Sequence, residues 1–267
     1  MHAFHHAFPR LRPASLAGAM LCLSIAGTAD AQVRISEIRI DHPGASAGLA
    51  DREEFVELVG PVGTSLDALS YVVVGDHLPE GGNSGVIEKV IHLHDQVIGP
   101  SGRFVFAAHD FTPDNEDYTL TIDFEDGGTV THLLVENLAG ASVGTEIDTQ
   151  HDGFVDYEPW DRVLDALAIV DPDDDTFAYG PIGTAHGPDG LCLRGAECNL
   201  IVIAADDPGH FYRCLSTGGW IEGAFDPGSV AGIGTPGALN PCPPILADGF
   251  DGQQPPGSHA VLRALPD

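Results

Sequence analysis

The sequence predicts an all-β protein built as an antiparallel β-sandwich, and two observations support this prediction. Its 33 Gly and 20 Pro make up about a fifth of the 267 residues, which favours many turns between short strands. No segment keeps an apolar stripe at helical spacing over three turns, whereas many short runs are apolar or alternate between apolar and polar residues. The hydrophobic content of 43% is sufficient for a core.

The strands themselves are predicted from runs bounded by turn residues. The clearest run is 118–124, where apolar and polar residues alternate without a fault, as on a half-buried strand. Gly- and Pro-containing clusters, such as those at 79–83 and 99–102, separate the predicted strands from one another. The less regular predicted strands are residues 33–41, 54–59, 71–75, 86–94, 103–107, 129–135, 163–170, 200–204 and 210–214. This spacing is typical of a one-domain sandwich.

Residues 1–31 are predicted to be a secretory signal peptide. Two arginines precede an apolar run at 16–26, and Ala29 and Ala31 place small residues at the two positions that a signal peptidase reads. The run of about a dozen residues is shorter than the ~20 residues that cross a bilayer. We therefore expect cleavage after Ala31 and a secreted or periplasmic protein without a membrane span. A retained membrane anchor is the competing interpretation.

The charge of the chain argues against nucleic acid as a direct partner. The 11 Lys and Arg stand against 40 Asp and Glu, a formal charge of −29 at pH 7. Removal of residues 1–31 leaves 9 basic and 39 acidic residues, or −30. Binding to phosphates depends on clustered Lys and Arg, which this chain lacks. Cations and cationic partners suit such a surface better.

Four cysteines remain after the expected cleavage, and all of them lie in the last third of the chain. An even number in an exported protein favours two disulfides over a metal site, because the spacing shows neither a Cys-x-x-Cys pair nor a histidine at ligand distance. Four cysteines allow three pairings. Cys192 and Cys198 flank a short segment that a bridge would close as a hairpin loop, and this pairing leaves Cys214 with Cys242.

Three short motifs occur in a fixed order along the chain. Ile-Ser-Glu-Ile stands at 35–38, Glu-Glu-Phe-Val-Glu-Leu at 53–58 is followed by an apolar strand within 66–75, and Gly-Thr-Pro-Gly-Ala-Leu-Asn stands at 234–240. The first motifs resemble the opening of a lamin tail domain, and the last is similar to the closing segment of its bacterial members. The acidic segment at about 137–232 resembles a loop-rich insertion of exported bacterial lamin-tail-like proteins.

The resemblance covers about residues 33–241. It implies an immunoglobulin-like β-sandwich over 32–242, elaborated by the acidic insertion. It also implies a non-catalytic role in adhesion, anchoring or recognition, with an extracellular or cell-surface protein or polysaccharide as partner. The proline-rich sequence that follows predicts a flexible tail at 243–267.

The sharpest chemical motif runs over 148–158. Oxygen-bearing side chains occupy positions one, three, five and nine, and Gly153 occupies position six, where a calcium loop needs a sharp bend. The motif departs from an EF-hand because position twelve is Pro159, which leaves a bidentate ligand to Glu158 or Asp161. The predicted Ca²⁺ ligands are Asp148, Gln150, Asp152, Phe154 through its carbonyl, Asp156 and Glu158. A solvated acidic turn is the alternative.

A second candidate is the pair His92 and His94. On a strand these side chains point to the same face, as a two-histidine metal site requires. An exported metal-dependent hydrolase of nuclease or phosphoesterase type, using this pair and nearby carboxylates, is therefore the alternative function. However, no third ligand at a known spacing, nucleophile elbow or phosphate-binding loop occurs in the sequence. We therefore expect a protein without catalytic activity, in which the histidines lie on an exposed strand face.

Overall fold

The computed structural model describes most of the predicted sandwich. The described residues are 32–40, 54–75, 85–109, 111, 115–124, 128–170, 177–179, 185–186, 200–202, 209–214, 218–223 and 234–242. All regular secondary structure in these ranges is β-strand, which confirms the all-β prediction. Within the same ranges we find no helix with the length and apolarity needed to cross a membrane. The expected signal peptide, the expected tail, Cys192 and Cys198 lie outside the described residues.

Thirteen strands lie in the described part of the chain. They are β1 (Arg34–Arg39), β2 (Phe55–Val59), β3 (Leu69–Gly75), β4 (Val86–His92), β5 (Arg103–Ala108), β6 (Tyr118–Leu120), β7 (Val130–Glu136), β8 (Arg162–Val170), β9 (Ala178–Tyr179), β10 (Ala185–His186), β11 (Leu200–Val202), β12 (His210–Arg213) and β13 (Trp220–Glu222). β9, β10 and β13 were not predicted from the sequence. Strands of two or three residues carry too little pattern for such a prediction unless they lie within a longer apolar or alternating run, as β6 and β11 do.

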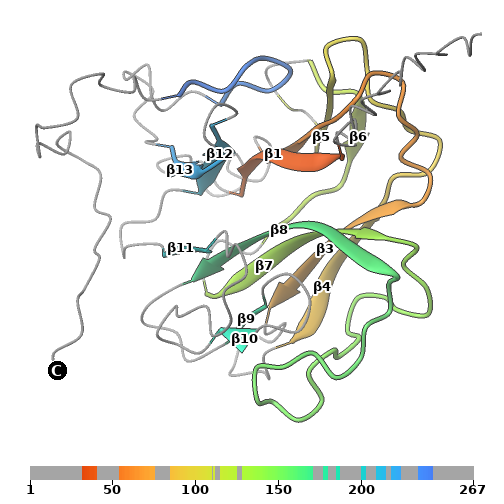
Figure 1. Ribbon diagram of the computed structural model, residues 1–267, viewed down its shortest axis with the longest axis vertical. Coiled ribbons are helices and arrows are strands. Elements are labelled where there is room, and N and C mark those ends of the chain that lie inside the picture. Colours follow the sequence, from red (N-terminus) through yellow and green to blue (C-terminus); the bar gives the residue numbers. More distant parts are fainter. Residues whose placement is uncertain are drawn as a thin grey trace, which may run out of the picture. The chain divides into compact units, whose positions relative to one another are not determined.

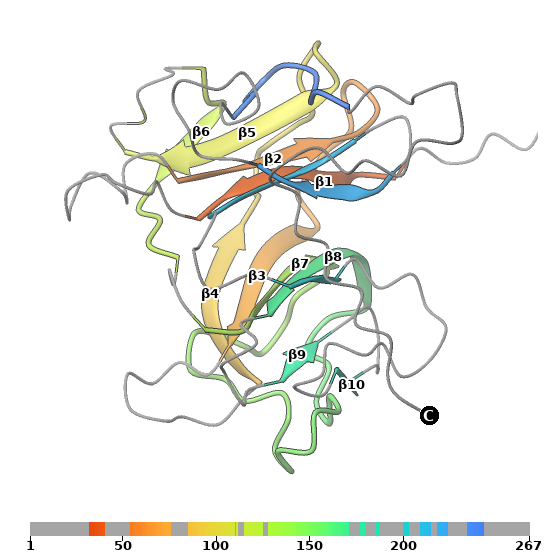
Figure 2. The same ribbon diagram turned by 90° about the vertical axis from the view of Figure 1, so that its left-hand side faces the viewer.

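Two sheets contain eleven of these strands. The larger sheet has the order β13-β12-β1-β2-β5-β6, and the smaller has the order β11-β8-β7-β3-β4. Neighbouring strands are antiparallel except for two parallel pairs, β5 with β6 and β8 with β11. β9 and β10 form a separate antiparallel pair. Figures 1 and 2 show the sheets as two layers, with β1, β2 and β5 in one and β3, β7 and β8 in the other.

A hydrophobic core fills the space between the two sheets. Ile38 and Phe106 enter it from the larger sheet, and Tyr71 and Leu134 enter it from the smaller one. All four side chains are fully buried. The shared cluster shows that the sheets pack face to face as a β-sandwich, because the apolar side of each sheet is covered by the other.

A buried ion pair crosses this core. Nη2 of Arg213 in β12 lies 2.8 and 2.9 Å from the two carboxylate oxygens of Asp165 in β8. The same carboxylate accepts a hydrogen bond from the backbone N–H of Ile35 in β1, and the guanidinium lies 4.6 Å from the centre of the Trp220 ring. Charge and hydrogen bonding therefore connect the sheets in addition to apolar packing.

The smaller sheet is packed on its outer face as well. Val72 and Val74 of β3 belong to a second cluster with Ile147 and Trp160, which come from the segment between β7 and β8. All seven residues of β3 are therefore buried. A strand covered on both faces is expected to be a continuous apolar run, and this explains why β3 does not alternate.

Two predicted features take a different form in the structure. The expected strand at 118–124 contains only three strand residues, because Leu120 pairs with Ala108, where β5 ends, and no strand in the described ranges pairs with the chain beyond this point. Ile122 and Phe124 are nevertheless buried, so the alternation of the side chains persists. The expected insertion at 137–232 contributes β8 and β12 to the two sheets, and so contains framework strands as well as loops.

Candidate functional site

The motifs that carry the resemblance meet on the outer face of the larger sheet. Glu37 of β1 and Glu57 of β2 are opposite each other in the strand register, and neither is exposed (0%). Residues 234–242, called here the closing segment, lie against them. The backbone N–H of Thr235 donates to Oε1 of Glu37 at 2.7 Å, and the backbone N–H of Gly237 donates to Oε2 of Glu57 at 2.8 Å. Hydrogen bonds thus join three stretches that are far apart in the sequence.

The shape of the closing segment follows from its sequence. Thr235-Pro236-Gly237-Ala238 forms a turn in which the N–H of Ala238 donates to the carbonyl of Thr235 at 2.8 Å. Proline at the second position fixes φ, and Gly237 at the third has a φ of +77°, which glycine adopts without the steric cost of a Cβ. The turn directs its backbone N–H groups at the two glutamates.

Each glutamate also has a partner within the sheet. Nε2 of His210 in β12 lies 2.7 Å from Oε1 of Glu37, and Nε of Arg103 in β5 donates to Oε1 of Glu57 at 3.1 Å. Burial, followed by the charge of Glu37, raises the pKa of Glu57 to about 7, although the hydrogen bonds to Glu57 oppose this shift. The site therefore holds two adjacent carboxyl groups of which one titrates near neutral pH.

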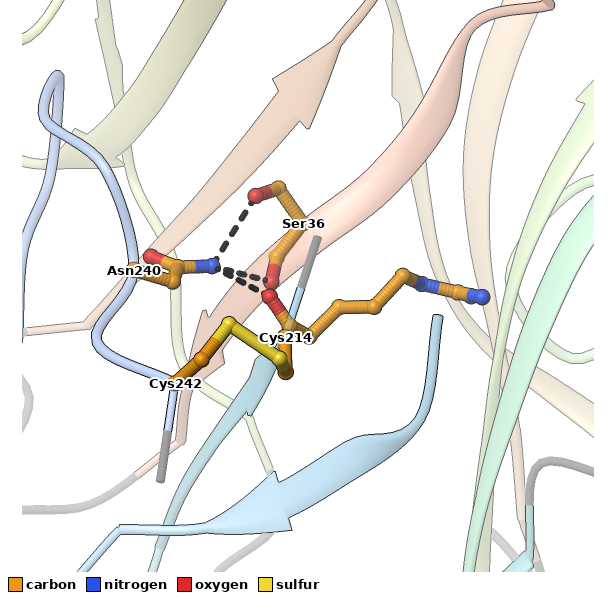
Figure 3. Close-up of a disulfide and its surroundings, with 5 residues drawn as sticks. Ser36, Cys214, Asn240 and Cys242 are labelled. Atoms are coloured by element: carbon orange, nitrogen blue, oxygen red, sulfur yellow. Dashed lines mark hydrogen bonds between the residues drawn. A yellow bond between two sulfur atoms is a disulfide. The ribbon is translucent and has the colours of Figure 1, made fainter. Parts of the chain in front are cut away.

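The end of the closing segment is held by an amide side chain and a disulfide. The register of β1 against β2 shifts at Ser36, a bulge that leaves this residue without a partner in β2. Nδ2 of Asn240 lies 2.9 Å from the carbonyl oxygen of Ser36 and 3.1 Å from that of Arg213 (Figure 3). Beside it, Cys214 and Cys242 form a disulfide, which confirms this predicted pairing.

This arrangement is suited to holding the chain together. Every carboxylate oxygen of Glu37 and Glu57 accepts a hydrogen bond from the protein, and both side chains are closed to solvent. A group that acts as a catalytic acid or base has to reach a substrate, which neither glutamate does here. The contact between these glutamates and the closing segment was not predicted from the sequence. The available signal was an acidic residue inside an otherwise apolar strand, since such a residue is rarely buried without partners.

The predicted calcium loop is organised around Asp148, which is fully buried. Its Oδ1 accepts from the backbone N–H of Asp152 at 3.2 Å, and its Oδ2 accepts from the backbone N–H of Gly153 and the hydroxyl of Tyr179, both at 2.8 Å. Burial and the hydrogen bond to Asp148 raise the pKa of the Tyr179 hydroxyl, which keeps its proton and donates it. Gly153 has a φ of +80°, as the bend requires.

The other predicted ligands lie nearer the surface. Asp156 accepts from the Thr149 hydroxyl at 2.9 Å and from the side-chain amide of Gln150 at 2.6 Å, and these contacts, led by Gln150, lower its pKa. Oδ1 of Asp152 accepts from the backbone N–H of Phe154 at 3.1 Å. The side chain of Phe154 is 41% exposed, and Glu158 is also exposed.

The loop therefore uses Asp148 and Asp156 to bind its own N–H and O–H groups. Among the described residues, no three His, Cys, Asp or Glu side chains are grouped so that they could hold a metal ion. Calcium binding by this loop therefore stays a prediction. What the geometry provides is a loop with a fixed backbone that presents carboxylates and two exposed aromatic rings, Phe154 and Tyr157.

His92 and His94 lie at the edge of the smaller sheet and are both exposed. Leu93, which separates them, is fully buried. Strand β4 ends at His92, so His94 belongs to the following turn. In comparisons with protein-family models, curated proteins and solved structures, the chain matches none.

Proposed function

We propose that this chain is an exported, non-catalytic binding or anchoring module of the lamin-tail type with an immunoglobulin-like sandwich. One observation carries the proposal. The motifs that resemble the opening and the end of a lamin tail domain are in contact, through the hydrogen bonds from Thr235 and Gly237 to Glu37 and Glu57. A role in holding the framework together is sufficient to explain why these motifs are present, so no catalytic role is needed to explain them.

The loop at 148–158 is the surface that best fits recognition. Asp148, Asp156 and Tyr179 fix its backbone, so little conformational entropy remains to be lost on binding. It exposes Phe154 and Tyr157, and exposed aromatic rings provide contact area at low entropic cost. With a chain charge of −29, the partner is an extracellular or cell-surface protein or polysaccharide that carries positive charge.

Binding is tested with the mature chain and named supports. Peptidoglycan, chitosan, cellulose and beads coated with a lysine-rich protein are incubated with the protein and sedimented. We expect retention on a cationic support, and we expect the double variant Phe154→Ser with Tyr157→Ser to reduce it about tenfold. Val62→Ser, at an exposed apolar residue outside this loop, is the matched control. Retention that is absent from every support, or unchanged in the loop variant, contradicts the proposal.

The hydrolase alternative is tested separately. Phosphodiester and glycoside chromogenic substrates are incubated with the protein and added Zn²⁺, Mg²⁺ or Ca²⁺, and we expect no turnover above buffer. Turnover that disappears in His92→Ala would establish the enzyme instead.

The calcium prediction has its own measurement, a thermal melt in calcium and then in chelator, repeated with Asp152→Ala. A midpoint raised by calcium only in the unmodified chain would support calcium binding by this loop.

A further inference from the structure

The exposed histidine pair has no part in the proposed function, but its geometry suggests that it has a separate role. His92 and His94 flank a fully buried leucine at the end of β4, the edge strand of the smaller sheet. Their ring centres are 5.5 Å apart, and their ring planes differ by 22°. Two exposed imidazoles are therefore held side by side by a backbone that the buried leucine anchors.

The separation of the rings suits one shared metal ion. Bonds from zinc to imidazole nitrogen are about 2.0–2.1 Å, so two imidazoles on one tetrahedral ion have ring centres roughly 5 Å apart. The observed 5.5 Å is close to this value. Rotation of the His94 ring about its side-chain bonds, without movement of the backbone, can then direct one of its nitrogens towards an ion bound by His92.

The surroundings of the pair resemble the outer contacts of metal-binding histidines. Nδ1 of His92 lies 2.9 Å from the hydroxyl of Ser70 on the neighbouring strand. This hydrogen bond orients the ring and uses Nδ1, which leaves Nε2 as the nitrogen that would bind a metal. Histidines that bind metals usually use their second nitrogen in such a hydrogen bond. The turn after the pair is also fixed, because Oδ1 of Asp67 accepts from the backbone N–H of Asp95 at 2.7 Å.

We propose that His92 and His94 form a two-histidine site for a divalent transition-metal ion of the Zn²⁺, Ni²⁺ or Cu²⁺ class, with water in the remaining positions. These ions prefer imidazole nitrogen, whereas Ca²⁺ prefers oxygen. The acidic chain raises the concentration of cations near its surface. With two protein ligands the site binds a metal without assembling the three-ligand centre of a zinc hydrolase.

The test is calorimetric titration of the mature chain with Ni²⁺ and Zn²⁺ at pH 7.5 in the presence of excess Ca²⁺. We expect one site, and we expect His92→Ala and His94→Ala each to weaken its affinity about tenfold or more. His109→Ala, which removes another exposed histidine, should bind like the unmodified chain.

NMR spectra and melting temperatures complete the test. In nitrogen-detected NMR spectra, the imidazole signals of both His92 and His94 should shift with one equivalent of Zn²⁺. Melting temperatures of the two alanine variants are compared with that of the unmodified chain, since exposed positions should tolerate alanine. The proposal is overturned if the metal affinity is unchanged in either alanine variant, or if the signals of only one imidazole shift with Zn²⁺. It is also overturned if Ca²⁺ displaces the metal. None of these readings depends on the proposed binding partner.

Discussion

Arg213 and Asp165 form a salt bridge between the two sheets, with Nη2 of the arginine 2.8 and 2.9 Å from the two carboxylate oxygens. Both side chains are less than a tenth exposed. Burial raises the pKa of Asp165, and the charge of Arg213 opposes this shift. The pair therefore has a high desolvation cost that only its own contacts offset.

Removal of Asp165 alone should destabilise the protein more than removal of both Asp165 and Arg213. We expect Asp165→Leu to lower the free energy of unfolding by about 3–5 kcal/mol, because it leaves Arg213 charged and buried. The double variant Asp165→Leu with Arg213→Met should recover a large part of this loss. Urea unfolding measures both changes.

The matched control for this pair is at the surface. Glu136→Ala removes the partly exposed ion pair with Arg162, and it should cost less than about 1 kcal/mol. A double variant in which the single effects simply add would contradict the coupling.

Asn240 should anchor the closing segment far more strongly than its neighbour. Its amide donates to the carbonyls of the bulged residue Ser36 and of Arg213, so Asn240→Ala removes these buried hydrogen bonds. We expect a loss of roughly 2 kcal/mol, measured by urea unfolding. Leu239→Ala, at a side chain that is 71% exposed, should change stability by less than about 0.5 kcal/mol. Similar losses in both variants would show that the hydrogen bonds of Asn240 do not anchor the segment.

The hydroxyl of Tyr179 should determine how firmly the loop at 148–158 is held. Tyr179→Phe removes one of the donors to the buried carboxylate of Asp148 and keeps the aromatic ring. We expect a loss of about 1–3 kcal/mol and faster proteolytic cleavage within the loop. Tyr157→Phe is the matched control, because this tyrosine is 41% exposed. Cleavage at the same rate in both variants would argue against the role of Asp148 as the anchor.

Local pattern was sufficient to find the main strands. Apolar runs such as the one in β3 predict buried strands wherever they occur. The same runs do not reveal which segment covers them, and β3 is covered on one face by Ile147 and Trp160, more than 70 residues later. Coverage depends on the fold as a whole, so it has no signature at the strand itself.

The contacts of the candidate site could not be predicted from local sequence patterns either, because they also depend on the fold as a whole. Glu57 and Gly237 are 180 residues apart, and nothing near either residue predicts that the N–H of one donates to the carboxylate of the other. The disulfide between Cys214 and Cys242 could be predicted because an even number of cysteines restricts the pairings. For Asp148 the spacing predicted a tight acidic loop, whereas its burial and its contact with Tyr179 depend on β9.

Glu57 should make the stability of the protein depend on pH. Burial, and then the charge of Glu37, raises its pKa from 4.5 to about 7. Because the folded pKa exceeds the unfolded one, the stability linked to this proton is fully present below about pH 4.5 and is lost as the pH rises through about 7. The shift corresponds to a change on the order of 3 kcal/mol.

We therefore expect the free energy of unfolding to decline from about pH 4.5 to about pH 7, and we expect Glu57→Gln to flatten this decline. Glutamine keeps an acceptor oxygen for the N–H of Gly237, so the variant should retain the turn of the closing segment. Glu136→Gln, at a partly exposed glutamate, should leave the slope unchanged. An unaltered slope in Glu57→Gln would mean that ionisation of Glu57 does not lower the stability of the folded protein.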